Sequence, residues 1–541
     1  MKPLDASQQT WVDQTLASLS LPELVAQLLI PKIDNEDSVP ALLQLMRDIP
    51  FGGLFVWGAP AAEHRRRIEA LQKASRIPIV VAADLEAGGG YVVHGTAAFP
   101  DPLAVAAAGR EDLAYAMGQA AAVEGRAAGI HWAFAPLVDV NINPDNPIAN
   151  SRCFGDDPEL VSRLSCAVIR GMQDHGLAAC AKHFPGDGLD DVDQHISTSI
   201  NPLRLEDWKH ISGRTFNAAF AADALTTMIG HIAFPAWDSA RDARGCYTPA
   251  TLSSRIVTDL LRSEMGFEGL VVTDDMNMGG AAGYANRHDR TIGCIRAGCD
   301  MLLFPALPQD YETLLAAVKS GAIPEARIRN AARHVLEFKA RLGFHRGEVF
   351  GPEPSANDRA AFSKAAQDVA ESSICCVRDT NHLLPLRQLR KGAQVLTVTL
   401  TNDHHELTEV DRELERRGFR VRHIVADNYG AVDKHRDGAE AIFINFTFKA
   451  NWGVGSPRSV GPFNRAFMNG FHMEHPCVVF TSFGSPYHLR QFTSLPNLVN
   501  VHSSSVLSQL AAVRAWFGEI PMMAKSPVGK LERKWSDGIL A

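Results

Sequence analysis

Charged and polar residues that could bind a substrate or move a proton follow short apolar runs at five places along the chain. They are Asp84, Asp139, the pair Lys182 and His183, His231, and the pair Asp274 and Asp275. One such residue says little, because every strand has to end at something polar. The carboxyl ends of parallel strands meet at one rim of a barrel, so five of them together predict a charged pocket there.

A short acidic segment, residues 184–195, adds a second set of reactive groups. It contains four aspartates, two glycines and one histidine. Asp193 and His195 stand two residues apart, which in an extended loop places both side chains on one side. A carboxylate orients an imidazole and raises its basicity, so the pair is a candidate for acid and base catalysis on a mobile loop. A solvated acidic loop and an oxygen-ligand cation site remain alternatives, although the spacing of an EF-hand loop is not met.

Motifs for several other chemistries are absent from the sequence. It has no P-loop, no G-x-S-x-G nucleophile elbow and no H-E-x-x-H zinc motif. The run from His404 to Glu406 resembles a metal motif only superficially and is interpreted as surface. Neither a metal nor a cofactor is therefore predicted.

Eight continuous apolar runs with helical segments between them must position these residues. Continuous runs are typical of parallel strands that are buried on both faces. One intervening helix is well marked, since Asp157 and Pro158 provide an N-cap and a first-turn proline, and Gly176 stands at its expected end. The runs span residues 26–30, 53–57, 79–84, 132–139, 178–183, 227–231, 270–274 and 301–304. Eight strands that alternate with helices predict an α/β fold, a (β/α)8 TIM-like barrel.

The remainder of the chain predicts a second, smaller domain. Glycines and prolines gather within residues 346–360, which are typical of an interdomain linker. Beyond them, strand-like runs at 395–400, 420–425, 441–448, 478–483 and 498–502 are separated by helical segments such as 506–517. We therefore expect a barrel over residues 1–345 and an α/β sandwich domain over residues 361–541.

The composition is that of an ordinary globular protein. Of 541 residues, 46% are hydrophobic and 21% are charged, and 53 basic against 61 acidic residues give a net charge of −8. This excludes disordered, collagen-like and disulfide-scaffold chains and argues against a nucleic-acid partner. No apolar run reaches the roughly 18 residues that a membrane span needs. Nine cysteines without a C-x-x-C pair predict reduced thiols and a cytoplasmic protein, and the oligomeric state stays open.

Several separate motifs resemble glycoside hydrolase family 3. They are FAPLVDVN at 134–141, the segment 143–158 with RCFGDDP at its end, KHFPG at 182–186, PATLS at 249–253 and GFEGLVVTD at 266–274. Their order and spacing agree over residues 20–345, and the segment 482–487 is similar to the second domain of two-domain members. The resemblance implies a retaining glycosidase that acts on a small carbohydrate substrate.

The same resemblance assigns roles to individual residues. It implies that Asp274, the first acid after the seventh strand, is the nucleophile. The Asp-x-His loop resembles the β-N-acetylglucosaminidase (β-N-acetylhexosaminidase) branch, which implies that His195 is the acid/base and Asp193 its partner. Sugar hydroxyls are expected at Asp84, Arg152, Lys182, His183 and His231. The cationic groups among them also make an anionic sugar fragment, such as a disaccharide from peptidoglycan recycling, a plausible substrate.

Some residues depart from the pattern of that branch and keep other activities open. Asp187 stands where a histidine is common, and the resulting Gly-Asp-Gly is similar to the β-glucosidase branch. Gln194 replaces the usual small hydroxyl residue, and Glu86 is followed by Ala-Gly-Gly without the usual arginine. A β-glucosidase remains one alternative. A phosphorylase is another, because an imidazole that has given up its proton does not repel phosphate. A non-catalytic sugar sensor is disfavoured, since Asp274 and His195 are both present.

Overall fold

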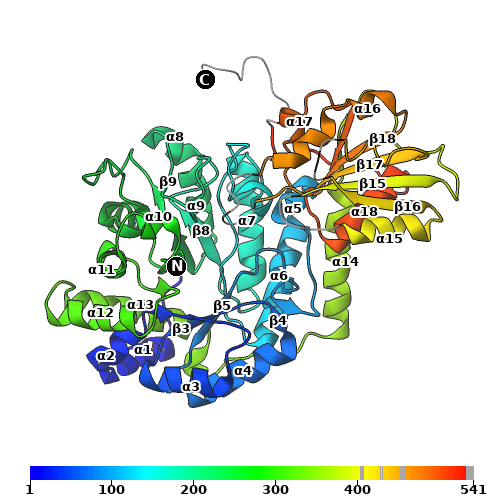
Figure 1. Cartoon of the computed structure of the whole chain (residues 1–541). Coiled ribbons are helices and arrows are strands. Elements are labelled where there is room, and N and C mark those ends of the chain that lie inside the picture. Colours follow the sequence, from blue (N-terminus) through cyan, green and yellow to red (C-terminus); the bar gives the residue numbers. More distant parts are fainter. Residues whose placement is uncertain are drawn as a thin grey trace. The chain divides into compact units, whose positions relative to one another are not determined.

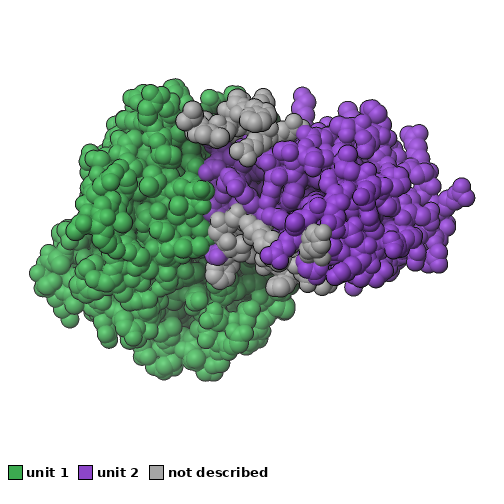
Figure 2. All heavy atoms as spheres, turned by 45° about the horizontal axis from the view of Figure 1, so that its top comes forward, with its two compact units in different colours: residues 1–98, 114–140, 158–363 green, residues 99–113, 141–157, 364–541 purple. Residues whose placement is uncertain are grey.

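The computed structural model describes residues 1–401, 407–426, 428, 430–450, 453, 457–459, 461–529 and 531. The run from His404 to Glu406 lies outside them. The chain divides into two compact units (Figure 2). The first comprises Met1–Ala98, Ala114–Val140 and Pro158–Ser363, and the second comprises Phe99–Leu113, Asn141–Asp157 and Lys364–Ala541. Two segments from the first third of the sequence thus cluster with the C-terminal part.

Each of the eight apolar runs of the first unit contains a strand (Figure 1). The strands are β1 (Leu29–Ile30), β3 (Gly53–Val56), β5 (Val80–Ala83), β7 (Trp132–Ala133), β8 (Cys180–Phe184), β10 (Thr226–Ile229), β12 (Leu270–Thr273) and β13 (Leu302–Leu303). Short strands accompany them: β2 (Lys32–Ile33), β4 (Ala59–Pro60), β6 (Val93–His94), β9 (Ser199–Ile200) and β11 (Ile232–Ala233). The predicted strands are therefore confirmed. Most lie within their runs, whereas β8 extends one residue beyond its run and β10 begins one residue before its run.

All strand pairs of the first unit are parallel. The pairs join β2, β3, β5 and β7 in one sheet, β8, β10 and β12 in a second, and β1 and β13 in a third. Isolated parallel bridges connect Trp132 with Ala178 and Val272 with Met301. Alternate strand residues, among them Phe55 and Val272, share one apolar core cluster. This is a TIM-like β/α architecture whose strands are buried on both faces, as continuous apolar runs indicate.

Helices separate these strands along the chain. They are α1 (Ala6–Ser18), α2 (Leu21–Ala26), α3 (Val39–Asp48), α4 (Ala61–Ala74), α6 (Glu111–Ala128), α7 (Pro158–Gln173), α8 (Leu205–His210), α9 (Ser212–Ala221), the π-helix η3 (Arg255–Glu264), α10 (Gly279–Ala282), α11 (Arg287–Ala297), α12 (Gln309–Lys319) and α13 (Glu325–Arg341). The helix expected after Asp157 is α7, and Gly176 beyond it has a φ of 78°, which favours glycine.

The second unit contains one six-stranded sheet between two sets of helices. The strand order is β14 (Cys375–Asp379), β19 (Asn497–Asn500), β18 (Val478–Ser482), β17 (Ala441–Phe446), β15 (Gln394–Leu400) and β16 (Arg420–Val425). Residues of α14 (Ala356–Ser372), α15 (Thr408–Arg416) and α18 (Val506–Trp516) pack on one face. Residues of α16 (Phe471–Glu474) and α17 (His488–Gln491) pack on the other, with α5 (Pro102–Ala108) belonging to the same unit. The five expected strands are present, and β14 is an additional antiparallel edge strand.

Three further features bear on the sequence expectations. Helix α14 begins at Ala356, inside the stretch expected to be a linker, and the limits of the two domains stay a prediction. All nine cysteines are free thiols, and six of them are buried. Among the described helices, none is both long and apolar enough to cross a membrane.

Candidate active site

Asp274 directly follows strand β12 and is nearly buried. Its backbone N–H donates to the carbonyl of Ile229, so the end of β10 fixes its position. Burial raises the pKa of the Asp274 carboxyl. The imidazoles of His183, His231 and His195 oppose burial, and the pKa ends below the usual 3.8. The carboxylate is therefore ionised at neutral pH.

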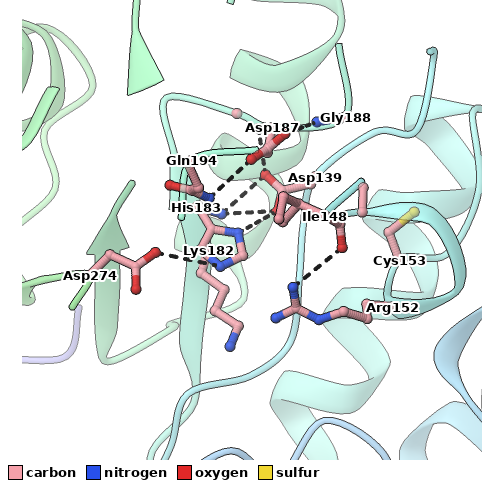
Figure 3. Close-up of polar contacts among 12 residues, drawn as sticks. Asp139, Ile148, Arg152, Cys153, Lys182, His183, Asp187, Gly188, Gln194 and Asp274 are labelled. Atoms are coloured by element: carbon pink, nitrogen blue, oxygen red, sulfur yellow. Dashed lines mark hydrogen bonds and ion pairs between the residues drawn. The ribbon is translucent and has the colours of Figure 1, made fainter. Parts of the chain in front are cut away.

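His183, on strand β8, is the histidine that faces this carboxylate (Figure 3). Its Nε2 lies 4.0 Å from Oδ2 of Asp274. Its Nδ1 lies 2.8 Å from Oδ2 of Asp139, and its backbone N–H donates to both Asp139 oxygens. Because Asp139 is fully buried and accepts the Nδ1 proton, it fixes the ring with Nε2 toward Asp274.

Lys182, the preceding residue on β8, binds two carboxylates. Its Nζ lies 2.7 Å from Oε1 of Glu86 and 3.2 Å from Oδ1 of Asp84. The lysine side chain is buried, whereas the Asp84 side chain is 49% exposed. Asp84 thus offers oxygen atoms to solvent while its position is restrained by a buried cation.

Asp193 and His195 form the contact that their spacing predicts. Oδ1 of Asp193 accepts the backbone N–H and the Nδ1–H of His195, each at 2.8 Å. Asp193 is buried, whereas the imidazole is 26% exposed. Asp193 therefore sets the orientation of the imidazole, with Nε2 as the ring nitrogen on the far side from the carboxylate.

His231 and Asp275 lie behind Asp274. Nδ1 of His231 lies 2.9 Å from the hydroxyl of Thr251, and Nε2 lies 2.8 Å from the carbonyl of Asp275. Burial lowers the pKa of His231. Burial, with the charge of Asp274 among the lesser causes, raises the pKa of Asp275. The two neighbouring aspartates are thus driven in opposite directions, and Asp274 is the one held as an anion.

Arg152 belongs to the second unit. It ends a short 3-10 helix, η1 (Asn150–Arg152), and its Nη1 donates to the carbonyl of Ile148 at 3.3 Å (Figure 3). The neighbouring Asn150 is buried, and its backbone N–H donates to the side chain of Asn141. The helix that carries Arg152 is thereby fixed within its own unit.

Seven of the eight predicted site residues lie in the first unit, and six of them form three contacting pairs, whereas His231 contacts Thr251 and the carbonyl of Asp275. Asp84 contacts Lys182, His183 contacts Asp274, and Asp193 contacts His195. Sequence reasoning noted Asp139 as a strand end but gave it no role, and it assigned no role to Glu86 or Thr251. The register of β7 against β8 brings Asp139 next to His183. That register cannot be recognised from a local sequence pattern.

An ionised carboxylate, such as that of Asp274, suits nucleophilic attack. An imidazole oriented by a carboxylate, as His195 is by Asp193, suits proton transfer. No group of three or more histidine, cysteine or acidic side chains in the described part of the chain is arranged to hold a metal ion.

The chain is similar to several known carbohydrate-active enzymes. The family model described as "Glycosyl hydrolase family 3 N terminal domain" matches residues 20–338. A "Beta-N-acetylglucosaminidase/beta-glucosidase" of Cellulomonas fimi is 32% identical over 98% of both chains. A "Beta-hexosaminidase A" of Pseudoalteromonas piscicida is 33% identical over 50% of this chain and 49% of that protein. The solved structure "Beta-glucoside phosphorylase BglX bound to 2FGlc" superposes with a TM-score of 0.89 at 30% identity, covering 98% of each chain. The chain belongs to glycoside hydrolase family 3.

Proposed function

We propose that the protein is a retaining β-glycosidase that removes terminal β-N-acetylglucosamine. In the first step, the Asp274 carboxylate attacks the anomeric carbon and His195 gives its Nε2 proton to the departing glycosidic oxygen. In the second step, His195 takes a proton from water, and the resulting hydroxide attacks the glycosyl ester to release the sugar and Asp274. The observation that carries this proposal is the contact of Asp193 with His195, in which Oδ1 of Asp193 accepts Nδ1–H at 2.8 Å and leaves Nε2 as the far ring nitrogen.

The eight strands are proposed to close into a (β/α)8 barrel, which would place these groups at one mouth. The parallel pair of β1 and β13 and the parallel bridges at Trp132 and Val272 support closure. Active sites of such barrels lie at the carboxyl ends of the strands. Asp274 directly follows the carboxyl end of β12, and Lys182 lies two residues before the end of β8.

Four side chains are proposed to hold the sugar. Asp84 and Lys182 would bind hydroxyls, with Arg152 as a further donor, and His183 would contact the sugar beside the nucleophile. His231 is proposed to act without touching the sugar, because both its ring nitrogens have protein partners. Its Nε2 contact with the carbonyl of Asp275 would hold the backbone directly after the nucleophile.

The sugar is proposed to be N-acetylglucosamine because of the Asp193 and His195 pair. The names of the Cellulomonas fimi and Pseudoalteromonas piscicida relatives include this activity. The Cellulomonas fimi name also includes β-glucosidase, and Asp187 favours that second sugar. The two activities share one mechanism and differ in the group at C2.

Phosphorolysis is the second candidate reaction. A similar solved structure is named as a β-glucoside phosphorylase, and it covers nearly the whole chain. After His195 has given up its proton it is neutral, so it adds no negative charge beside an incoming phosphate. A carboxylate acid/base would repel phosphate at the same point.

A panel of aryl β-glycosides, with and without phosphate, tests the proposal. We expect N-acetylglucosaminides to be cleaved with a higher kcat/KM than glucosides. Release of free sugar in phosphate buffer supports hydrolysis, whereas sugar 1-phosphate supports phosphorolysis. Faster cleavage of glucosides would reject the proposed sugar, and no cleavage of any glycoside would reject the proposed function.

A further inference from the structure

Gln194 lies between Asp193 and His195, and its side chain is fully buried (Figure 3). Its Nε2 donates to Oδ2 of Asp187 at 3.0 Å. Its Oε1 accepts the backbone N–H of His231 at 2.9 Å. The amide thus joins the loop that carries His195 both to an earlier part of that loop and to the segment after β10.

The backbone on either side of this amide is tied down as well. The carbonyl of Gln194 accepts the N–H of Gly280, and the carbonyl of His195 accepts the N–H of Gly279. Both glycines belong to helix α10, which begins five residues after Asp274. The loop is therefore bonded to the segment that follows the nucleophile.

Asp187, the partner of Gln194, continues the connection toward the nucleophile. Its backbone N–H donates to Oδ1 of Asp139 at 2.8 Å. The other oxygen of Asp139 binds Nδ1 of His183, whose Nε2 faces Asp274. A continuous series of polar contacts therefore runs from the acid/base loop to the nucleophile (Figure 3).

We propose that Gln194 is a positioning residue that holds the loop 186–200 in place, so that His195 is aligned before substrate binds. This inference rests on the proposed function, in which His195 is the acid/base. A small hydroxyl side chain at this position could not span the two groups that the amide joins. Gln194, in place of a small hydroxyl residue, would thus hold this loop in a fixed position.

Each of these hydrogen bonds has a fixed donor and a fixed acceptor, so substitutions that exchange the two roles test the inference. Asp187 accepts from Gly188 through Oδ1 and from Gln194 through Oδ2. The backbone N–H of His231 needs an acceptor, which the oxygen of the amide provides. Gln194→Glu would turn a carboxylate toward Asp187, and Asp187→Asn would turn an amide N–H toward the N–H of Gln194. Each single change leaves a buried mismatch.

The two changes together restore the pattern. In Asp187→Asn with Gln194→Glu, the new amide accepts from Gly188 and donates to the new carboxylate, which still accepts the N–H of His231. We expect each single variant to lose roughly 10- to 100-fold in kcat/KM on glycosides with poor leaving groups. The loss should be smaller for nitrophenyl glycosides, which need little protonation. The double variant should recover most of the activity.

Asp191→Asn is the matched control, because Asp191 is an exposed carboxylate on the same loop. It should leave the rate unchanged for every leaving group. Equal losses on good and poor leaving groups, or a double variant no better than the singles, would overturn the inference.

Amide hydrogen exchange of residues 186–200 gives a readout that needs no activity. Exchange should be faster in both single variants than in the wild type, and slow again in the double variant. Exchange that is the same in the wild type and in the single variants would contradict the anchoring role. If the wild type cleaves no glycoside, the proposed function fails, and the exchange measurement still decides whether Gln194 holds the loop.

Discussion

Two histidines of the candidate site have different surroundings and therefore different proposed roles. His183 is buried, and Asp139 fixes its ring toward Asp274. His195 is fixed by Asp193 in the same way but keeps a quarter of its side chain exposed. An exposed, oriented imidazole suits proton exchange with a leaving group and water, whereas a buried one suits control of a neighbouring charge.

Replacing His195 tests its role as the acid. His195→Ala should lower the rate about 10²–10⁴-fold on substrates with poor leaving groups, because general acid catalysis contributes that much. The loss should shrink for a nitrophenyl leaving group, which departs with little protonation. Asp193→Ala should show the same trend with a smaller effect, since it only orients the ring. Near-normal rates of both variants on every leaving group would mean that the acid lies elsewhere.

The sequence predicted the chemical groups of the site better than their partners. Asp274 and Lys182 could be found because each ends an apolar run, and His195 because Asp193 stands two residues before it. The role of Asp139 could not be found in this way. It depends on how β7 and the segment after it lie beside β8, which is a property of the register and not of a local pattern.

The sequence predicted where most strands and helices lie, but it predicted their first and last residues less well. The run at 132–139 becomes strand only at Trp132–Ala133, since Pro136 has no N–H for a ladder. The edge strand β14 was missed because it is only partly buried and has no continuous apolar run. The segment at Arg255–Glu264 is a π-helix, although its apolar spacing also suits an α-helix.

Helix α10 offers a test of how closely the acid/base loop must be held. A Cβ on Gly279 would lie 2.0 Å from the carbonyl oxygen of Ile196, which is backbone and cannot move alone. Gly279→Ala should therefore displace the loop, and a shift of about 1 Å can cost roughly 100-fold in rate. The loss should again be largest for poor leaving groups.

Gly293→Ala is the control for this experiment. On helix α11, a Cβ at Gly293 would meet only the end of the flexible Leu252 side chain, at 3.2 Å. This variant should keep the wild-type rate. Full activity of Gly279→Ala would show that the loop position does not limit catalysis.

At the scale of the whole first unit, Asp300 joins several elements in one buried ion-pair network. Its carboxylate contacts Arg262 at 2.6 Å, His334 at 3.0 Å and Arg327 at 3.2 Å, and accepts the N–H of Val271. The network connects η3 and α13 to strand β12, which leads to the nucleophile. Burial raises the pKa of Asp300, but the cations outweigh it and lower the pKa to about 2.

Asp300→Asn should lower the free energy of unfolding by about 3–5 kcal/mol at neutral pH, because it leaves the partly buried guanidinium groups of Arg262 and Arg327 without their buried anion. The folded pKa lies below the unfolded one, so the stabilisation is present above pH ~4 and is lost as pH falls toward ~2. Urea unfolding at several pH values measures it. The difference between wild type and variant should narrow in that window, and a constant difference would contradict the ion-pair account.

The division into two units was the least predictable feature of the molecule. Residues 99–113 and 141–157 cluster with the C-terminal sheet although both lie within the stretch expected to be barrel. The clustering of these segments with the C-terminal part depends on contacts between residues far apart in sequence. A linker, in contrast, is recognised from local glycine and proline content. Arg152 lies in one of these segments, which is why its place in the site stays a prediction.

Trapping of the covalent intermediate tests the central claim most directly. A 5-fluoro N-acetylglucosaminide with a good leaving group keeps the acetamido group at C2 and slows the second step, so the glycosyl enzyme accumulates and can be digested and identified by mass spectrometry. We predict one sugar per chain, on a peptide in which Asp274 carries the label, and no label in Asp274→Asn. A label on Asp275, or no label while the wild type still turns over, would contradict the assignment of Asp274 as nucleophile.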